Sequence, residues 1–197
     1  MDAGTTITEV RGREGERFVE GLASLRIRVF RDFPYLYDGN MEYEKKYLQT
    51  YFSSPRSFLA LCFSHGTLVG ACTAIPLADE EESFQRPFVR NGIDPKTLCY
   101  YGESMLLPEL RGRGIGRDFM ARRERHARSL AGVTHAAFCA VIRKATPAGY
   151  RSLEPFWESV GFRKIPGLET EYSWKDIGEA AETTKRMQFW MKKLEMQ

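Results

Sequence analysis

The segment from Leu106 to Arg117 (LLPELRGRGIGR) constrains the fold of this chain more than any other. An apolar run with strand character ends at Pro108, and glycines follow at positions 112, 114 and 116. Apolar residues at helical spacing begin directly afterwards, at Ile115 and Phe119. We therefore expect a buried strand, a glycine-rich turn and a helix in immediate succession.

This turn has the properties of an anion-binding site. Glycine lacks a Cβ, so an anion can approach the backbone N–H groups closely. The first N–H groups of a helix have no partner inside the helix, and the helix dipole favours negative charge there. Arg111, Arg113 and Arg117 add positive charge, so a diphosphate would fit. On spacing alone, a ligand-free turn remains the alternative.

Two other phosphate-binding patterns are absent from the segment. The dinucleotide pattern G-x-G-x-x-G would need glycine at position 117, which is Arg117. A P-loop would need the sequence Gly-Lys-Ser/Thr after its glycines, and the segment has none.

The rest of the chain predicts one mixed sheet with helices on both faces. Helical spacing covers residues 16–31, 41–52, the basic stretch that ends at 130, and 150–160. Residues 77–97 look like an irregular insertion. Apolar or alternating runs predict strands at 5–10, 57–63, 67–76, 98–107, 135–142, 162–165, 171–174 and 186–194.

Composition sets the broad class. A chain of 197 residues with 43% hydrophobic and 28% charged residues fits a single folded domain, 1–197. No apolar run is long enough to span a bilayer, and Met1–Arg11 has no apolar core of a signal peptide, so we expect a cytoplasmic protein without membrane contact. The net charge of +3 does not by itself imply a nucleic-acid partner.

The four cysteines lie in or beside apolar runs and are expected to be buried free thiols. Cys139 is the one that could instead be a catalytic thiol, because it lies near the proposed site. No group of ligands has zinc spacing, so no metal is expected.

Two motifs carry a resemblance to a known family. Arg111-x-x-Gly114-x-Gly116 resembles the acetyl-CoA signature R/Q-x-x-G-x-G/A of the GNAT N-acetyltransferase superfamily. The later segment 155–162 (PFWESVGF) resembles that superfamily's second motif, and the element order matches over nearly the whole chain. The resemblance implies an α/β fold: a mixed, mostly antiparallel sheet of about seven strands, splayed in the middle, with helices on both faces.

The resemblance also implies acetyl-CoA as the acetyl donor. Backbone groups of Ser104, Met105 and Leu106 would pair with the pantetheine arm, and the sheet would splay between 98–107 and 135–142 to admit it. Gly102 suits such an irregularity. Trp157 would pack against the cofactor or the core. The diphosphate would be held by the loop residues Arg111, Gly112, Arg113, Gly114, Ile115, Gly116 and Arg117.

Acetyl transfer to an amine requires the neutral amine, and deprotonating a lysine-like amine at pH 7 costs roughly 4.6 kcal/mol. Glu103 is the candidate general base, since a carboxylate among apolar residues would have a raised pKa. Its alternative role is structural. Related enzymes often protonate the leaving thiolate with a tyrosine of the second motif, but this chain has Trp157 there. Tyr150 is the candidate replacement, and packing is its alternative role.

The superfamily usually builds its acceptor pocket from the first two helices and the loop after the 135–142 strand. Here Phe33, Tyr35 and Tyr37 could form an aromatic wall, or could simply cap the core. Of Arg26 and Arg28, which cannot share a helix face, we assign Arg28 to the acceptor. The basic segment 143–151 favours an acidic or carboxylate-bearing acceptor.

The expected function is therefore transfer of an acetyl group from acetyl-CoA to a primary amine of a small molecule or peptide, in a ternary complex. The alternative is a GNAT-like acyl-CoA sensor without turnover. The basic stretch 111–128 would also suit nucleic-acid phosphates, but the same arginines serve a cofactor's phosphates or a solvated helix face, so no nucleic-acid partner is expected. A homodimer through the last strands is compatible with the sequence, although no particular residue indicates one.

Overall fold

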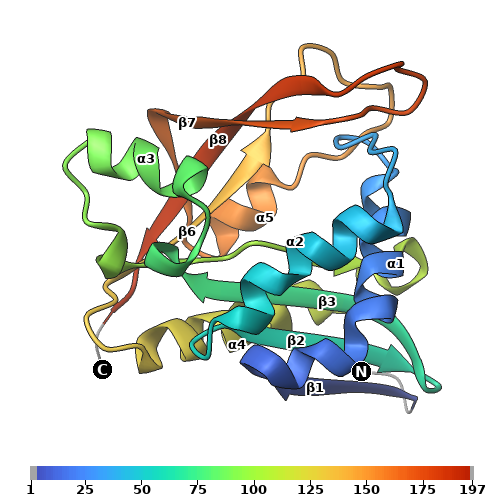
Figure 1. Ribbon diagram of the computed structural model, residues 1–197, viewed down its shortest axis with the longest axis horizontal. Coiled ribbons are helices and arrows are strands. Elements are labelled where there is room, and N and C mark those ends of the chain that lie inside the picture. The colour runs from blue at the N-terminus through green and yellow to red at the C-terminus, as the bar shows by residue number, and fades with distance from the viewer. Residues whose placement is uncertain (1–3, 196–197) are drawn as a thin grey trace.

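The predicted strand, turn and helix are present in the computed structural model, which describes residues 4–195 (Figure 1). Strand β5 (Ser104–Leu106) leads through a 3-10 turn at Pro108–Leu110 to helix α4 (Ile115–Ser129). Gly114 is the N-cap of α4 and has φ +83°, a left-handed conformation that glycine adopts without steric cost. The two ends of the predicted domain, residues 1–3 and 196–197, lie outside the described residues.

The strands described in residues 4–195 form one eight-stranded sheet in the order β1-β2-β3-β4-β6-β8-β7, with β5 paired to β3. Every pair in it is antiparallel except β4–β6, which is parallel. The predicted mixed, mostly antiparallel sheet is confirmed, with eight strands rather than about seven. The other strands are β1 (Thr5–Val10), β2 (Phe58–Ser64), β3 (Thr67–Pro76), β4 (Leu98–Tyr100), β6 (His135–Val141), β7 (Arg163–Trp174) and β8 (Thr183–Lys193).

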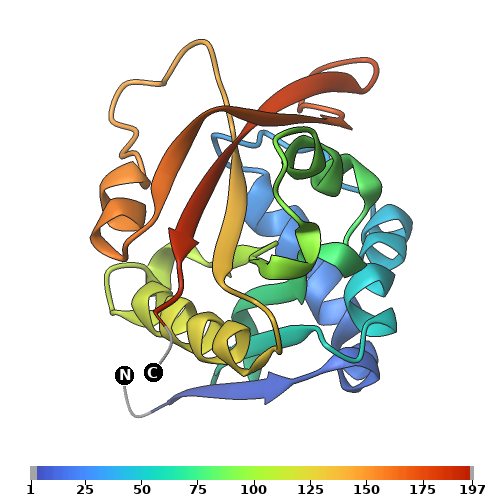
Figure 2. The ribbon, with the colours of Figure 1, turned by 90° about the vertical axis from the view of Figure 1, so that its left-hand side faces the viewer.

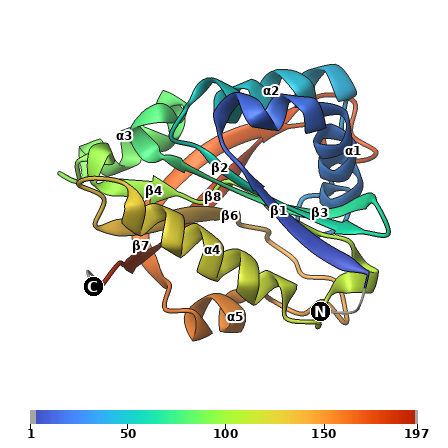
Figure 3. The ribbon, with the colours of Figure 1, turned by 90° about the horizontal axis from the view of Figure 1, so that it is seen from below.

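Helices cover both faces of this sheet, as predicted (Figure 3). Helices α1 (Val19–Phe30), α2 (Met41–Ser53) and α3 (Glu82–Arg90) lie on one face, and α4 and α5 (Glu154–Ser159) lie on the other. No helix in the described part of the chain is both long and apolar enough to cross a membrane.

The sheet splays in its middle because one predicted strand is two. Residues 98–107 form β4 and β5 with a break at 101–103. On the β4 side, the Tyr101 N–H still donates to the Ala137 carbonyl of β6, 2.7 Å away. After Gly102 the chain turns away, and β5 pairs only with β3. Strands β5 and β6 therefore diverge from this point (Figure 2).

Three predicted elements need correction. The 77–97 segment is not irregular: it contains α3, which buries Phe84 and Phe88 one turn apart in spite of Pro87 between them. The two short strands at 162–165 and 171–174 are one strand, β7, with an irregularity between Lys164 and Glu169. The predicted 150–160 helix begins only at Glu154.

Acid should destabilise this fold through His126 of α4. Its ring stacks on Phe58 with centroids 5.0 Å apart, and its Nε2 lies 3.0 Å from the Arg56 carbonyl oxygen. Its buried Nδ1 has no hydrogen-bond partner among residues 4–195. Burial lowers the pKa of His126 to about 4, so between pH 6.5 and 4 the unfolded chain binds the proton and the folded chain does not. We expect the free energy of unfolding to fall by about 2–3 kcal/mol across that range. Urea titrations at several pH values measure this loss, which should shrink in His126→Gln and persist in the control His65→Gln.

Candidate active site

Two cavities meet where β5 separates from β6. The larger has a volume of about 470 Å³ and extends along α4 and α5, and the smaller has about 80 Å³ and lies under α1, α2 and α3. Both are lined by Phe30, Tyr35, Gly102, Glu103 and Cys139. Two molecules that enter from opposite faces of the sheet could therefore meet at these residues.

The glycine-rich loop presents unused amides to solvent. Gly112 and Gly114 have positive φ, and a Cβ added at either would meet nothing within 4 Å. Within residues 4–195, the amides of Gly114, Ile115 and Gly116 donate to no protein acceptor, and the N-cap has no side chain to receive them. An open, amide-lined helix start of this kind fits a diphosphate.

The loop arginines lie around these amides. Arg111 is half exposed, and its Nε donates to the Leu106 carbonyl at 3.2 Å. The guanidinium of Arg117 lies 6.0 Å from the Phe156 ring and 3.4 Å from Ser159 Oγ, both of α5. Arg113 is exposed beside them. The positive charge predicted for this loop is therefore present at the start of α4.

The edge of β5 that faces the splay offers backbone groups to an extended ligand. The Thr73 N–H donates to the Glu103 carbonyl and the Leu107 N–H donates to the Val69 carbonyl, and these bonds fix the ladder between β5 and β3. Because hydrogen-bonded pairs alternate in an antiparallel ladder, Met105 is a hydrogen-bonded partner of Ala71. The N–H and C=O groups of Ser104 and Leu106 then face the opposite way, toward the gap, where the Leu106 carbonyl accepts from Arg111 Nε. Of the three residues predicted to pair with a pantetheine arm, Ser104 and the N–H of Leu106 are open to an extended ligand, whereas the backbone of Met105 is directed at β3.

Trp157 lines the larger cavity from α5. Its indole ring packs edge-on against Phe138, at 5.0 Å, and against Trp190, at 5.2 Å. It therefore contacts both the core and the cavity, which agrees with a packing role. An indole N–H donates hydrogen bonds but does not act as a practical acid.

A buried ion-pair cluster joins the two cavities. The Arg26 guanidinium of α1 pairs with both the Glu44 carboxylate of α2 and the Glu103 carboxylate. The Tyr47 hydroxyl donates to Glu103 Oε1 at 2.9 Å. One cation against two carboxylates leaves the cluster with a net negative charge.

Two of the predicted site residues have surroundings that the sequence did not indicate. Glu103 is not among apolar side chains alone, because α1 places Arg26 against it. Arg28, assigned to the acceptor, points to solvent: its side chain is 66% exposed and lies 3.7 Å from Glu109, whereas that of Arg26 is 8% exposed. Two residues turn a helix by about 200°, so only one of this pair can face the core.

The smaller cavity has an aromatic wall. Of the three residues predicted for an aromatic acceptor wall, Tyr35 and Tyr37 line this cavity and Phe33 does not. Tyr43 and Tyr47 of α2 join them, and their spacing with Tyr51 in the sequence gave a signal for one aromatic helix face. The residues that sequence reasoning missed come from distant segments: Phe84 from α3, Tyr100 from β4, and Tyr172, Trp174 and Met187 from β7 and β8.

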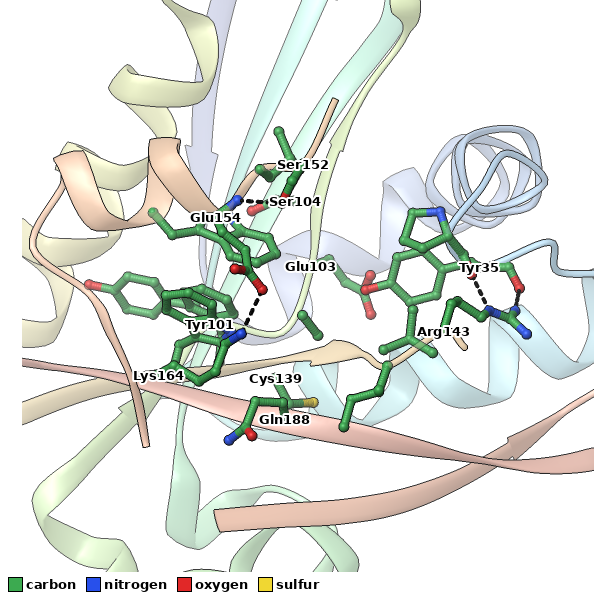
Figure 4. Close-up of a pocket in the computed structure, with 18 of the residues that line it drawn as sticks. Tyr35, Tyr101, Glu103, Ser104, Cys139, Arg143, Ser152, Glu154, Lys164 and Gln188 are labelled. Atoms are coloured by element: carbon green, nitrogen blue, oxygen red, sulfur yellow. Dashed lines mark hydrogen bonds and ion pairs between the residues drawn. The ribbon is translucent and has the colours of Figure 1, made fainter. Parts of the chain in front are cut away.

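Phe33 and Tyr150 lie together in the lining of the larger cavity. Their rings meet edge to face with centroids 4.6 Å apart, and burial raises the pKa of Tyr150. Nearby, Arg143 binds Asp176 at 2.6 Å. It also donates to the carbonyls of Pro34 and Tyr35 (Figure 4). Arg143 is thus engaged in holding the 33–37 segment, which removes it from the predicted carboxylate-binding wall.

The cysteines match their expected state. All four are free and buried. Cys139 lines both cavities with its Sγ 3.1 Å from the Tyr100 hydroxyl, but burial raises the pKa of its thiol to about 12. A thiol with that pKa is almost entirely protonated at neutral pH, which argues against a catalytic role. Within residues 4–195, no group of three or more potential ligands could hold a metal ion.

Several arginines of α4 are used by the fold. Arg123 is buried and donates to the Glu103 carbonyl at 3.1 Å. Arg125 binds Glu9 at 3.0 Å, and Arg128 binds Glu124 at 2.6 Å. These contacts neutralise part of the stretch that could have suited a nucleic acid.

The fold and the site together have the shape and the open backbone groups that an extended, diphosphate-bearing ligand would need. The family description Acetyltransferase (GNAT) family matches residues 23–162, so this chain belongs to the GNAT acetyltransferases, which use acetyl-CoA. The open loop amides and the free edge of β5 fit that cofactor.

Solved structures agree with this fold. A ribosomal-protein-alanine N-acetyltransferase from Brucella melitensis superposes with a TM-score of 0.60 at 15% identity, over 96% of this chain and 99% of that one. A putative acetyltransferase from Salmonella typhimurium, solved with its cofactor acetyl-CoA, gives 0.60 at 11% identity over 98% and 96%. A GNAT acetyltransferase from Streptococcus pneumoniae gives 0.61 at 13% identity over 97% and 99%. No curated protein matches the chain by sequence.

Proposed function

We propose that this protein is an N-acetyltransferase that moves an acetyl group from acetyl-CoA directly to a primary amine in a ternary complex. The observation that carries the proposal is the meeting of the two cavities at Gly102, Glu103 and Cys139. The larger cavity would hold the pantetheine end, and the smaller one would hold the acceptor. Bound acetyl-CoA would supply the acetyl group as a thioester.

The chain's own groups would orient and deprotonate the acceptor. The aromatic wall and the net negative charge of Arg26, Glu44 and Glu103 suit a cationic amine. This reverses the sequence expectation of a carboxylate-bearing acceptor. A cavity of about 80 Å³ admits an amine on a slender body. Glu103 would take the proton from the ammonium, and Tyr150, at the larger cavity, would be the proton donor to the leaving sulfur.

An acceptor screen tests this function. We expect acetyl-CoA and a panel of polyamines, aminoglycosides, arylalkylamines and peptides with free N-termini to give thiol release with at least one slender cationic amine. Glu103→Gln should lower that rate and leave acetyl-CoA affinity unchanged. Tight acetyl-CoA binding with no thiol release from any amine would support the alternative, an acyl-CoA sensor. A cytoplasmic location and a homodimer remain predictions.

The cofactor loop gives a separate prediction. Gly114→Ala should raise the Kd for acetyl-CoA at least 10-fold, because the methyl group and the relaxing backbone disturb the free amides at the start of α4. Calorimetric titration measures the change. Gly132→Ala is the matched control: Gly132 also has a positive φ, +78°, and open space around its Cβ, but it follows the other end of α4. Both variants should lose about 1 kcal/mol of stability, and equal acetyl-CoA affinities would contradict the proposed site.

A further inference from the structure

A chain of buried hydroxyls leads away from Glu103. Helix α2 places Tyr47 and Tyr51 one turn apart, and their hydroxyl oxygens are 3.3 Å from each other. The Tyr47 hydroxyl also donates to Glu103 Oε1 at 2.9 Å. The proposed base is therefore connected by hydrogen bonds to a residue, Tyr51, that lines neither of the two cavities.

The carboxylate of Glu80 lies at the far end of this chain. Glu80 is 4% exposed, and its Oε1 accepts the N–H of Glu81 at 3.2 Å. Its Oε2 is buried and completes no hydrogen bond within the described residues. The Tyr51 hydroxyl is the neighbouring side-chain donor, near enough to oppose the rise in the Glu80 pKa that burial causes.

Glu80 also borders solvent on its other side. It lines a surface hollow together with Thr50, Ser53, Ser54, Pro55, Arg56, Asp79 and Glu81. This hollow shares no lining residue with either of the two cavities. Of the four linked residues, Glu103, Tyr47, Tyr51 and Glu80, Glu80 alone lines this hollow.

We propose that Tyr47, Tyr51 and Glu80 relay the acceptor's proton from Glu103 to water in this hollow. The proposal rests on the proposed N-acetyltransferase function. It adds three residues to the reaction and gives Glu80 a catalytic task, although Glu80 never touches the acceptor.

The relay moves one proton and leaves each hydroxyl as it was. The ammonium N–H bond breaks, its electron pair stays on nitrogen, and Glu103 becomes a carboxylic acid. Glu103 then protonates the Tyr47 oxygen while Tyr47 passes its own proton to Tyr51, and Tyr51 passes its proton to Glu80. Burial raises the pKa of both tyrosines, so the transfers are concerted and no tyrosinate forms. Glu80 finally releases the proton to water.

The surroundings of Glu80 suit it to the far end of the relay. Arg26 is paired with Glu103 at the near end. Burial raises the pKa of Glu80 to about 7, so Glu80 can take up and release a proton at neutral pH. The charged and titratable side chains around Glu80 are Asp79, Glu81 and Arg56 at the hollow, and Tyr51 and Glu103 on the inner side. Arg56 is paired with Asp79.

The test compares pH profiles of kcat for Tyr51→Phe, Glu80→Gln and the control Glu82→Gln, whose side chain is exposed and does not line the hollow. In the wild type, kcat should rise with pH through a group with a pKa near 7, because Glu80 must be ionised to receive the proton. Tyr51→Phe and Glu80→Gln should each lower kcat about 10- to 100-fold at pH 7 and lose this rise. Glu82→Gln should match the wild type.

Binding and folding measurements separate the relay from a structural role. The relay requires unchanged KM for acetyl-CoA and unchanged melting temperatures in the variants that lose kcat. If the wild-type enzyme is active and both variants keep its kcat and its pH profile, the relay is overturned and the proposed function stands. A drop in kcat that follows a lower melting temperature and keeps the rise near pH 7 would also overturn it. A wild-type protein that acetylates no amine would overturn the proposed function, and the relay with it.

Discussion

Replacing Arg26 by leucine is expected to lower the free energy of unfolding by about 3–5 kcal/mol and to abolish acetyl transfer. The change would leave two buried carboxylates, Glu44 and Glu103, without their shared counter-charge. Each must then be protonated or repelled by the other, and the proposed base loses its orientation. Urea denaturation measures the first effect, and thiol release measures the second.

Arg28→Leu is the matched control, two residues away on the same helix. Its side chain is exposed, so we expect a change below about 0.5 kcal/mol and normal turnover. Arg26→Lys should fall between the two variants, because an ammonium cannot bind both carboxylates with the fork of a guanidinium. Equal stability of Arg26→Leu and Arg28→Leu would show that the buried cluster contributes nothing to the fold.

Gly102→Ala should lower both the stability and the activity nearly as much as Arg26→Leu. A Cβ at this position would lie 1.8 Å from the Tyr51 hydroxyl oxygen and 3.0 Å from Thr73 Oγ1. Overpacking of a tight site usually costs about 1–3 kcal/mol, and this overlap places Gly102→Ala at the upper end of that range. The break between β4 and β5 would have to shift, so acetyl transfer should also fall at least 10-fold. Thermal melting and thiol release measure the two effects.

The double variant Gly102→Ala with Tyr51→Phe isolates the cause. It removes the closest contact but leaves the ring carbon Cζ at 2.9 Å, so it should recover part of the lost stability. It should not recover turnover, because the relay hydroxyl is also gone. Strictly additive losses of stability from the two single changes would show that the steric argument is mistaken.

The parts of the fold that were predictable are those in which local sequence and packing agree. Gly112 and Gly114, which follow a strand, specify a turn with positive φ that glycine adopts easily, and the structure has it; Gly116 already lies within α4. Helix α3 was missed because Pro87 and the acidic residues before it argue against a helix locally. Its stability comes from Phe84 and Phe88, which pack on β4, β7 and β8 residues far away in the sequence.

The site shows the same limit. The cofactor loop is one continuous segment, so its residues could be named from the sequence. The ion pair of Glu103 could not be predicted, because its partner Arg26 lies on a helix 77 positions earlier in the chain. Hydrophobic periodicity places an arginine on a face but does not show which face meets a buried carboxylate. The aromatic wall could not be predicted either, because it forms only when residues of β7 and β8 pack against those of α2.

The free edge of β5 has a consequence for how this protein can change. Recognition there would depend on main-chain N–H and C=O groups, which every residue except proline supplies. The exposed side chain at 104 is therefore a spare position for cofactor recognition, able to accept substitutions that retain extended backbone geometry, whereas Leu106 also packs against the core. New acceptor preferences could then arise in the aromatic cavity while the donor half of the site keeps working unchanged.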